Sequence, residues 1–180
     1  MDISTIGVIG AGTMGNGIAQ ACAVSGFAVV MVDIDEAAVQ RGLASVAASL
    51  DRLVKKDKLT LDAKLAALAR IRVGTDYAML LPAQLVIEAA TENEGLKRKI
   101  LAQLDALLPA ETLVATNTSS ISITKLAAAT QRPDRFIGMH FFNPVPMMAL
   151  VEVIRGLQTD RKSTRLNSSH LEQSRMPSSA

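Results

Sequence analysis

Residues 6–15, IGVIGAGTMG, decide the fold of this 180-residue chain. A short β-branched run leads directly into a G-x-G-x-x-G pattern, and residues 14–25 follow with helical spacing. This order is typical of a dinucleotide-binding unit, whose glycines allow a tight turn, a close backbone approach to a pyrophosphate and close helix packing. The positive end of the helix attracts the phosphates. We therefore expect a dinucleotide at six consecutive residues: Gly10, Ala11, Gly12, Thr13, Met14 and Gly15.

The rest of the chain alternates between short β-branched runs and stretches with helical spacing. We expect strands at 6–9, 28–32, 71–73, 85–88, 112–115, 136–139 and 150–154, and helices at 14–25, 36–58, 60–69, 95–108 and 123–130. Strands that alternate with helices form βαβ units, whose parallel sheet is buried on both faces. The predicted fold class is α/β: a Rossmann-type, doubly wound and mostly parallel sheet with helices on both faces.

The composition argues against several classes of protein. Hydrophobic residues make up 49% of the chain and the formal net charge is only +2, which supports neither disorder nor a nucleic-acid surface. No apolar run approaches the roughly 18 residues of a membrane span, and the first residues lack a secretory pattern. The single cysteine, Cys22, excludes an internal disulfide and a thiolate cluster. We expect a soluble, cytoplasmic protein with no metal site and no nucleic-acid or membrane partner.

The composition changes after Thr159. Residues 160–180 contain six serines and no apolar periodicity, so they could not bury a face. We expect residues 1–159 to form the dinucleotide-binding domain and residues 160–180 to be an unrelated tail, either disordered or foreign sequence. His170 lies in this tail and is not a catalytic candidate.

Asp33 ends the second predicted strand, where a carboxylate can accept hydrogen bonds from the ribose hydroxyls of adenosine. Its charge would repel a 2′-phosphate, and the nearest downstream basic residue, Arg41, lies inside the following helix. The predicted cofactor is therefore NAD rather than NADP. The alternative is a carboxylate that only caps the next turn.

His140 is the one histidine of residues 1–159 and stands at the carboxyl end of a predicted strand. Oxidation of an alcohol by hydride transfer needs a base for the hydroxyl proton, and imidazole titrates in the right range. Glu152 lies in an apolar run, where a carboxylate is costly unless it is paired. A buried pair across the bend at 143–146 would fix the tautomer of the imidazole. The alternatives are a structural histidine and a glutamate that faces solvent at a sheet edge.

Further polar residues follow two other predicted strands. In Asn117-Thr118-Ser119-Ser120, one hydroxyl could donate to the substrate oxygen, or a serine could cap the next helix. Glu92 and Asn93 could contact the nicotinamide ribose. The run Lys55-Lys56-Asp57-Lys58 is either a solvated helix end or a site for a ligand with many phosphates.

Five stretches, taken in order, resemble the 3-hydroxyacyl-CoA dehydrogenase family, and most of all its bacterial 3-hydroxybutyryl-CoA members. They are Ile-Gly-Ala-Gly-Thr-Met-Gly (9–15), Val-Ile-Glu-Ala-Ala (86–90), Thr-Asn-Thr-Ser-Ser (116–120), Gly-Met-His-Phe-Phe-Asn-Pro (138–144) and Leu-Val-Glu-Val-Ile (150–154). The resemblance covers residues 5 to about 159. It implies reversible, NAD-linked oxidation of an (S)-3-hydroxyacyl-CoA to the 3-oxoacyl-CoA.

The resemblance also implies roles for single residues. His140 would be the general base, Glu152 its partner, and Ser119 a ligand of the substrate oxygen. The NAD-contacting positions of the family fall on Glu92, Lys97, Ser119 and Asn143, and its CoA-contacting positions fall on Ser49, Lys56 and Ser119.

Family members continue into a helical C-terminal domain, which forms the dimer interface and supplies an active-site asparagine. The pattern of this chain stops near Thr159, so we expect NAD binding with little or no turnover. The surface that the absent domain would cover should be apolar. Two alternatives are another β-hydroxyacid dehydrogenase and a non-catalytic dinucleotide-binding module.

Overall fold

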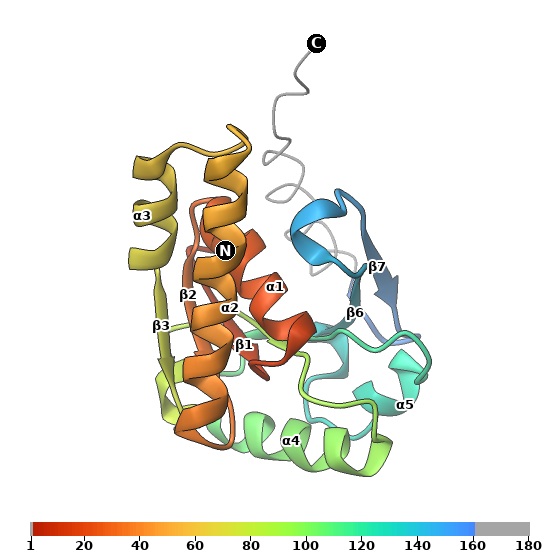
Figure 1. Cartoon of the computed structure of the whole chain (residues 1–180). Coiled ribbons are helices and arrows are strands. Elements are labelled where there is room, and N and C mark those ends of the chain that lie inside the picture. The colour runs from red at the N-terminus through yellow and green to blue at the C-terminus, as the bar shows by residue number, and fades with distance from the viewer. Residues whose placement is uncertain (1, 161–180) are drawn as a thin grey trace.

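A seven-stranded sheet runs through the molecule in the order β3-β2-β1-β4-β5-β6-β7 (Figure 1). The computed structural model describes residues 2–160, so most of the predicted tail, with His170, lies outside the described residues. The first six strands are parallel, and β7 pairs antiparallel with β6. The strands are β1 (Thr5–Ile9), β2 (Ala28–Val32), β3 (Ile71–Gly74), β4 (Leu85–Glu88), β5 (Leu113–Thr116), β6 (Phe136–Phe141) and β7 (Val151–Arg155).

Helices cover both faces of the sheet, which confirms the predicted fold class. One face carries α1 (Thr13–Val24), α2 (Glu36–Lys55) and α3 (Leu61–Ala69), and the other carries α4 (Glu94–Leu107) and α5 (Ile123–Ala127). Short 3₁₀ turns form η1 (Tyr77–Leu80), η2 (Pro133–Arg135) and η3 (Val145–Met147). Successive residues of β2 alternate between the faces: Val29 and Met31 join one apolar cluster, Val30 and Val32 the other. Burial on both faces explains why the strands read as unbroken apolar runs.

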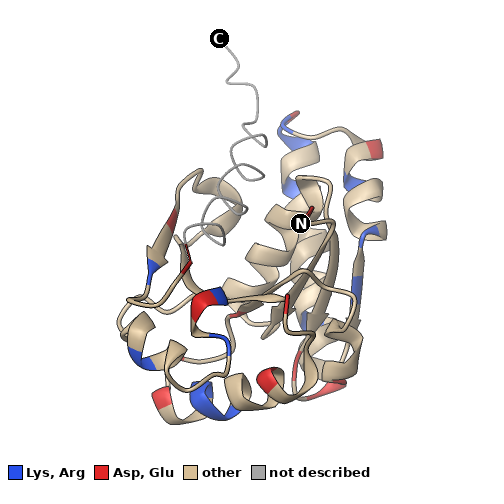
Figure 2. Ribbon diagram, turned by 180° about the vertical axis from the view of Figure 1, so that it is seen from behind, with Lys and Arg blue, Asp and Glu red and all other residues tan. Residues whose placement is uncertain are grey.

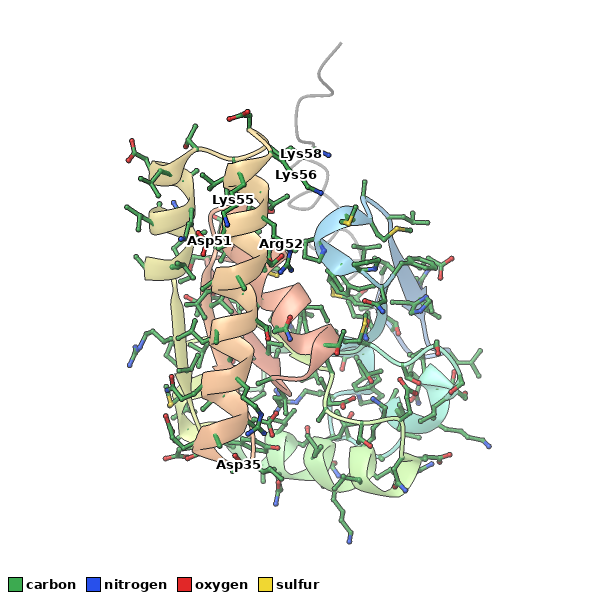
Figure 3. The ribbon with its side chains drawn as sticks, viewed as in Figure 1. Asp35, Asp51, Arg52, Lys55, Lys56 and Lys58 are labelled. Carbon is green, nitrogen blue, oxygen red and sulfur yellow. The ribbon has the colours of Figure 1, made fainter. Side chains whose placement is uncertain are left out.

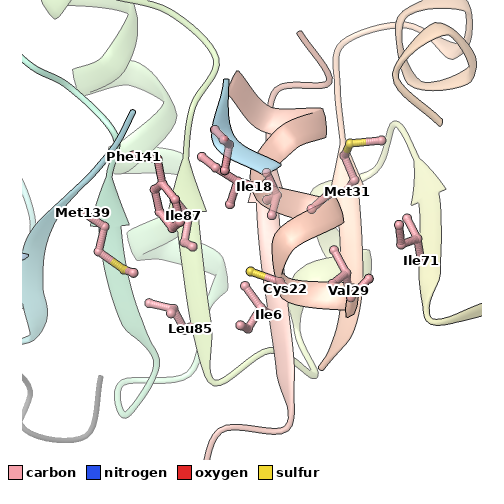
Figure 4. Close-up of a cluster of buried hydrophobic side chains, with 14 of the residues drawn as sticks. Ile6, Ile18, Cys22, Val29, Met31, Ile71, Leu85, Ile87, Met139 and Phe141 are labelled. Atoms are coloured by element: carbon pink, nitrogen blue, oxygen red, sulfur yellow. The ribbon is translucent and has the colours of Figure 1, made fainter. Parts of the chain in front are cut away.

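The larger apolar cluster lies between the sheet and α1. Figure 4 shows Ile18 and Cys22 of α1 over Ile6 and Ile87 of the central strands. Each fully buried aliphatic side chain of this kind contributes about 1.5–3 kcal/mol to folding. Burial raises the pKa of the Cys22 thiol to about 12, so the thiol stays protonated and is no nucleophile.

Most predicted element boundaries are confirmed within a few residues, and the differences have local causes. Thr60 caps α3 as expected. The predicted helix at 36–58 ends already at Lys55, because the chain turns at Asp57 with a φ of 54°. The predicted helix at 123–130 ends at Ala127. β6 runs on to Phe141, because β7 returns beside it and supplies the pairing.

The strands β1, β4, β5 and β6 end at one edge of the sheet. The register pairs Ile9 with Glu88, Glu88 with Thr116, and Thr116 with Gly138. In open α/β sheets this carboxyl edge is where ligands bind. The polar residues that follow β1, β4, β5 and β6 therefore converge on the candidate site.

Charged side chains of both signs are interspersed on the outer helices (Figure 2). Glu88, Lys97 and Arg132 are instead buried within the fold. No helix among residues 2–160 is long and apolar enough to cross a membrane.

Candidate active site

Steric crowding requires glycine at two positions of the turn between β1 and α1. Gly10 has a φ of +98°, and a Cβ there would lie 2.7 Å from the carbonyl oxygen of Ala89. A Cβ on Gly15 would lie 1.7 Å from the carbonyl oxygen of Gly10, so α1 packs directly on the turn. A Cβ on Gly12 would meet nothing within 4 Å. The turn thus presents an open backbone surface at Gly12, the N-cap of α1.

Asp33 holds this turn in place from the end of β2. Its Oδ2 accepts a hydrogen bond from the Ala11 N–H at 2.7 Å, and its Oδ1 accepts one from the Ile34 N–H at 2.7 Å. Since each carboxylate oxygen has a second lone pair, the half-buried group can still accept from a ribose hydroxyl. Arg41 is exposed on α2.

A pocket of about 250 Å³ opens beside the glycine turn. Its walls come from the segments that follow β1, β4 and β5 and from the first turns of α4. The lining residues are Gly12, Thr13, Met14, Ala89, Ala90, Thr91, Glu92, Lys97 and Asn117. The pocket therefore joins several of the predicted cofactor residues, which are far apart in sequence, at the carboxyl edge of the sheet.

A buried ion pair forms one side of this pocket. The Nζ of Lys97 donates to Oε2 of Glu88 at 2.6 Å, and the two side chains are 1% and 0% exposed. The hydroxyl of Thr116 donates to the same oxygen at 2.7 Å, and the Ala90 N–H donates to Oε1 at 2.9 Å. The ammonium of Lys97, predicted only as a cofactor contact, is thus also a structural partner of Glu88.

The loops after β4 and β5 are tied together across the pocket. The hydroxyl of Thr118 donates to Oε2 of Glu92 at 2.8 Å. Thr118 also accepts the N–H groups of Ser120 and Ile121, and Ser122 is the residue that caps α5. The expectation that a serine of residues 117–120 caps this helix is therefore wrong, because the cap falls after the loop.

Of the two candidates after β4, only Glu92 lines the pocket. Asn93 is the N-cap of α4, and its Oδ1 accepts the Leu96 N–H at 2.9 Å. Ser119 and Asn143 are exposed near the ends of β5 and β6, respectively. Exposure leaves both side chains available to a ligand, and neither lines the pocket described above.

His140 and Glu152 meet across the β6–β7 ladder, where they are register partners. The Nδ1 of His140 lies 3.0 Å from Oε2 of Glu152, and the ring packs at 4.5 Å against the ring of Phe142. Within the described residues the second ring nitrogen, Nε2, has no hydrogen-bond partner. The predicted pairing across the bend is therefore present in the structure.

The expected burial of Glu152 is wrong. The side chain of Glu152 is 50% exposed and that of His140 is 22% exposed, because β7 is the edge strand of the sheet. Nearby apolar side chains are exposed as well: Met147, Met148, Leu150, Ile154 and Leu157. These exposed apolar side chains belong to β7 and to the segments on either side of it.

The predicted CoA-contacting residues lie away from the pocket, toward the C-terminal end of α2. Ser49 is half-buried in the helix, and Lys56 directly follows it. Figure 3 shows Arg52, Lys55, Lys56 and Lys58 gathered at this helix end. Among the described residues there is no group of His, Cys, Asp or Glu that could hold a metal ion.

Sequence reasoning missed three residues of the site: Glu88, Asn117 and Thr118. Glu88 carried the signal that had singled out Glu152, an acidic residue in an apolar strand. Asn117 and Thr118 lie in the motif at 117–120, in which only Ser119 was predicted to contact a ligand. Their contacts join residues 24 and 26 positions apart, and only the register of the sheet brings these together.

Comparisons with known proteins agree on one family. The family model for the 3-hydroxyacyl-CoA dehydrogenase NAD-binding domain matches residues 5–175. The 3-hydroxybutyryl-CoA dehydrogenase of Bradyrhizobium diazoefficiens is 52% identical over 158 residues, which are 88% of this chain and 54% of that protein. The fatty acid oxidation complex subunit alpha of Acinetobacter baylyi is 44% identical over 161 residues, which are 89% of this chain and 22% of that protein.

Among solved structures, (S)-3-hydroxybutyryl-CoA dehydrogenase from Ralstonia eutropha superposes with a TM-score of 0.94 at 62% identity. That match covers 96% of this chain and 61% of the other. The chain thus spans about half the length of the 3-hydroxybutyryl-CoA dehydrogenases that it matches.

Proposed function

This chain belongs to the 3-hydroxyacyl-CoA dehydrogenase family, and from that premise we propose that it is the NAD-binding half of an enzyme that interconverts (S)-3-hydroxyacyl-CoA and 3-oxoacyl-CoA. The acyl substrate we assign is 3-hydroxybutyryl-CoA, after the names of its relatives. One observation carries the proposal: the His140–Glu152 pair stands at the same sheet edge as the glycine turn. This arrangement places a general base beside a cofactor-binding site.

The residues present fit NAD, the cofactor of this domain family. The open backbone at Gly12 and the N-terminus of α1 would hold the pyrophosphate, since a glycine N-cap brings no side chain that competes for the helix N–H groups. Asp33 would accept the adenosine ribose hydroxyls, and Glu92 and Lys97 would face the nicotinamide half. When bound, NAD supplies the hydride acceptor.

His140 would take the hydroxyl proton of the substrate on Nε2. Because Nδ1 faces Glu152 at 3.0 Å, the carboxylate favours the tautomer with hydrogen on Nδ1. Nε2 then has its lone pair available, and the carboxylate stabilises the imidazolium that forms. The hydroxyl of Ser119 would donate to the substrate oxygen, and Asn143 would contact the nicotinamide side of the cofactor.

The CoA moiety would lie along the C-terminal end of α2. Ser49 and Lys56 would bind it, supported by the positive charge of Arg52, Lys55 and Lys58. Since the chain spans about half the length of its relatives, we assign homo-oligomer formation and the second wall of the cleft to a helical domain beyond the matched region. We place the enzyme in the cytoplasm and expect this chain alone to bind NAD with little or no turnover.

The test joins this chain to the C-terminal half of the Bradyrhizobium relative and follows the oxidation of NADH by acetoacetyl-CoA. The joined protein should turn over, and His140→Gln should lower kcat about 100-fold or more while NADH affinity stays the same. A joined protein that binds NADH but stays inert would contradict the reaction. Full activity of the His140→Gln variant would show that His140 is not the general base.

A further inference from the structure

Gly42 lies in the interior of α2, where helix formation itself gives no reason for a glycine. Glycine stabilises a helix interior less than alanine does. The same helix contains five alanines: Ala37, Ala38, Ala44, Ala47 and Ala48. Among the described residues the glycines with a positive φ are Gly10 and Gly26, so Gly42 does not serve an unusual backbone conformation. The reason for this glycine must therefore lie in what it contacts.

Gly42 faces the glycine turn that precedes α1. Figure 1 shows α2 beside α1, and the two helices are in contact. A Cβ at Gly42 would lie 2.8 Å from the Cβ of Ala11 and 2.8 Å from its carbonyl oxygen. The methyl end of Met31, at 3.2 Å, is flexible and could move aside, but the backbone of Ala11 could move only together with the turn. The helix and the turn thus touch directly, with no room for a side chain between them.

The turn is held from a second side at the same residue. The Ala11 N–H donates to Oδ2 of Asp33 at 2.7 Å, and Ala11 is buried. Asp33 follows β2 and α2 begins at Glu36, so both contacts come from one β2–α2 unit. Ala11 is therefore fixed between a carboxylate and a helix, one residue before Gly12, the N-cap of α1.

We propose that Gly42 is a positioning residue for the cofactor, because its missing side chain lets α2 fix Ala11 and thereby both the turn and Asp33. This inference rests on the proposed function, in which Gly12 meets the pyrophosphate and Asp33 accepts the adenosine ribose hydroxyls. A methyl group on Gly42 would displace Ala11, and the Ala11 N–H would lose its alignment with Oδ2 of Asp33. The groups that bind the adenosine-diphosphate end of the cofactor would then shift together.

The test compares Gly42→Ala with Val46→Ile in the present chain. Each substitution adds one carbon atom to a packed position of α2, but Val46 lies one helical turn, about 6 Å, further along the axis and belongs to the apolar cluster under the helix. Dissociation constants are measured for NADH and for ADP, which contains the adenosine ribose and two phosphates but no nicotinamide half. The Tm of each variant separates a loss of stability from a loss of affinity in the folded protein.

We expect Gly42→Ala to weaken NADH and ADP by the same factor, roughly tenfold, because both ligands use the turn and Asp33. Val46→Ile should lower Tm and change neither dissociation constant by more than about twofold. Three outcomes would overturn the inference: unchanged affinities in folded Gly42→Ala, weakening of NADH alone, or equal weakening in Val46→Ile.

If Gly42→Ala does not fold, the comparison is made in an Ala11→Gly background, where the Cβ contact is absent and the carbonyl contact at 2.8 Å remains. The double variant should still bind ADP less tightly than Ala11→Gly alone, and equal affinities would overturn the inference. If the unsubstituted chain binds neither NADH nor ADP, the proposed function fails and the inference with it. If the unsubstituted chain binds both and Gly42→Ala binds them equally well, only the inference fails.

Discussion

Two buried ion pairs lie at opposite edges of the same sheet and have different roles. Glu88 and Lys97 meet at 2.6 Å at the carboxyl edge, beside the pocket. Arg132 and Asp105 meet at 2.8 Å at the amino edge, where α4 ends and β5 and β6 begin. Both pairs are nearly or fully buried, so burial alone does not distinguish a structural pair from one at a binding site.

The difference is in what else the cations contact. The Arg132 guanidinium donates to Asp105 Oδ1 and to four carbonyl oxygens that surround it, those of Asp105, Leu108, Pro109 and Thr112. It caps the C-terminal end of α4, and its N–H groups donate their hydrogen bonds to groups of the protein itself. Lys97 contacts Glu88 and Thr116 and also lines the pocket. The Arg132 donors are thus all used within the protein, whereas the Glu88–Lys97 pair borders the pocket at the carboxyl edge, where ligands bind in open α/β sheets.

Loss of Arg132 should have the largest effect on stability. In Arg132→Met the carboxylate of Asp105 loses its cationic partner and keeps one donor, the Gln131 N–H, and several carbonyls lose a donor. Because these groups remain nearly buried, the free energy of unfolding should fall by about 3–5 kcal/mol. Urea denaturation measures this loss, and NADH affinity of the folded protein should not change.

Arg135→Met is the matched control for this prediction. Arg135 lies in η2 only three positions along the chain, but it is partly exposed and 4.0 Å from its acidic neighbour. Its replacement should cost no more than about 1 kcal/mol. A large loss of NADH affinity in folded Arg132→Met would remove the distinction between the two edges.

Lys97→Met should lower both stability and ligand affinity. The cost should be smaller, about 2–3 kcal/mol, because Glu88 keeps two hydrogen-bond donors, the Thr116 hydroxyl and the Ala90 N–H. NADH affinity should fall roughly tenfold or more, since a charged donor at the pocket is lost. Calorimetric titration with NADH measures this, with Lys99→Met on the exposed side of α4 as control. Unchanged NADH affinity would show that the Glu88–Lys97 pair has only a structural role, like the Arg132–Asp105 pair.

The fold was readable from the sequence because its signals are local. The strand–glycine–helix unit at residues 6–15 and the unbroken apolar runs in 28–32 and 85–88 require only neighbouring residues to be read. The predicted helix at 36–58 is longer than α2, because Asp57 adopts a left-handed conformation that residue propensity does not predict.

The site was only partly readable, because its contacts depend on register. His140 and Glu152 were paired from the cost of a carboxylate in an apolar run, yet the carboxylate lies half exposed on an edge strand. Glu152 is therefore the predicted partner of His140, but a burial cost is not the reason for the pairing. Asn117 carried no such signal, because its partner, the Phe141 N–H, belongs to a backbone that only the folded sheet brings near.

Glu152→Gln should have the smallest effect on stability of the three substitutions. The pair with His140 is half exposed at the carboxylate, so its contribution to folding should not exceed about 1 kcal/mol. Glu94→Gln, which breaks the similarly exposed pair with Arg98, is the control and should cost as little. If His140 and Glu152 act in catalysis, Glu152→Gln should instead lower the kcat of the joined enzyme, because the imidazole loses its orienting partner. A loss of stability above about 2 kcal/mol with kcat unchanged would class this exposed pair with Arg132 and Asp105.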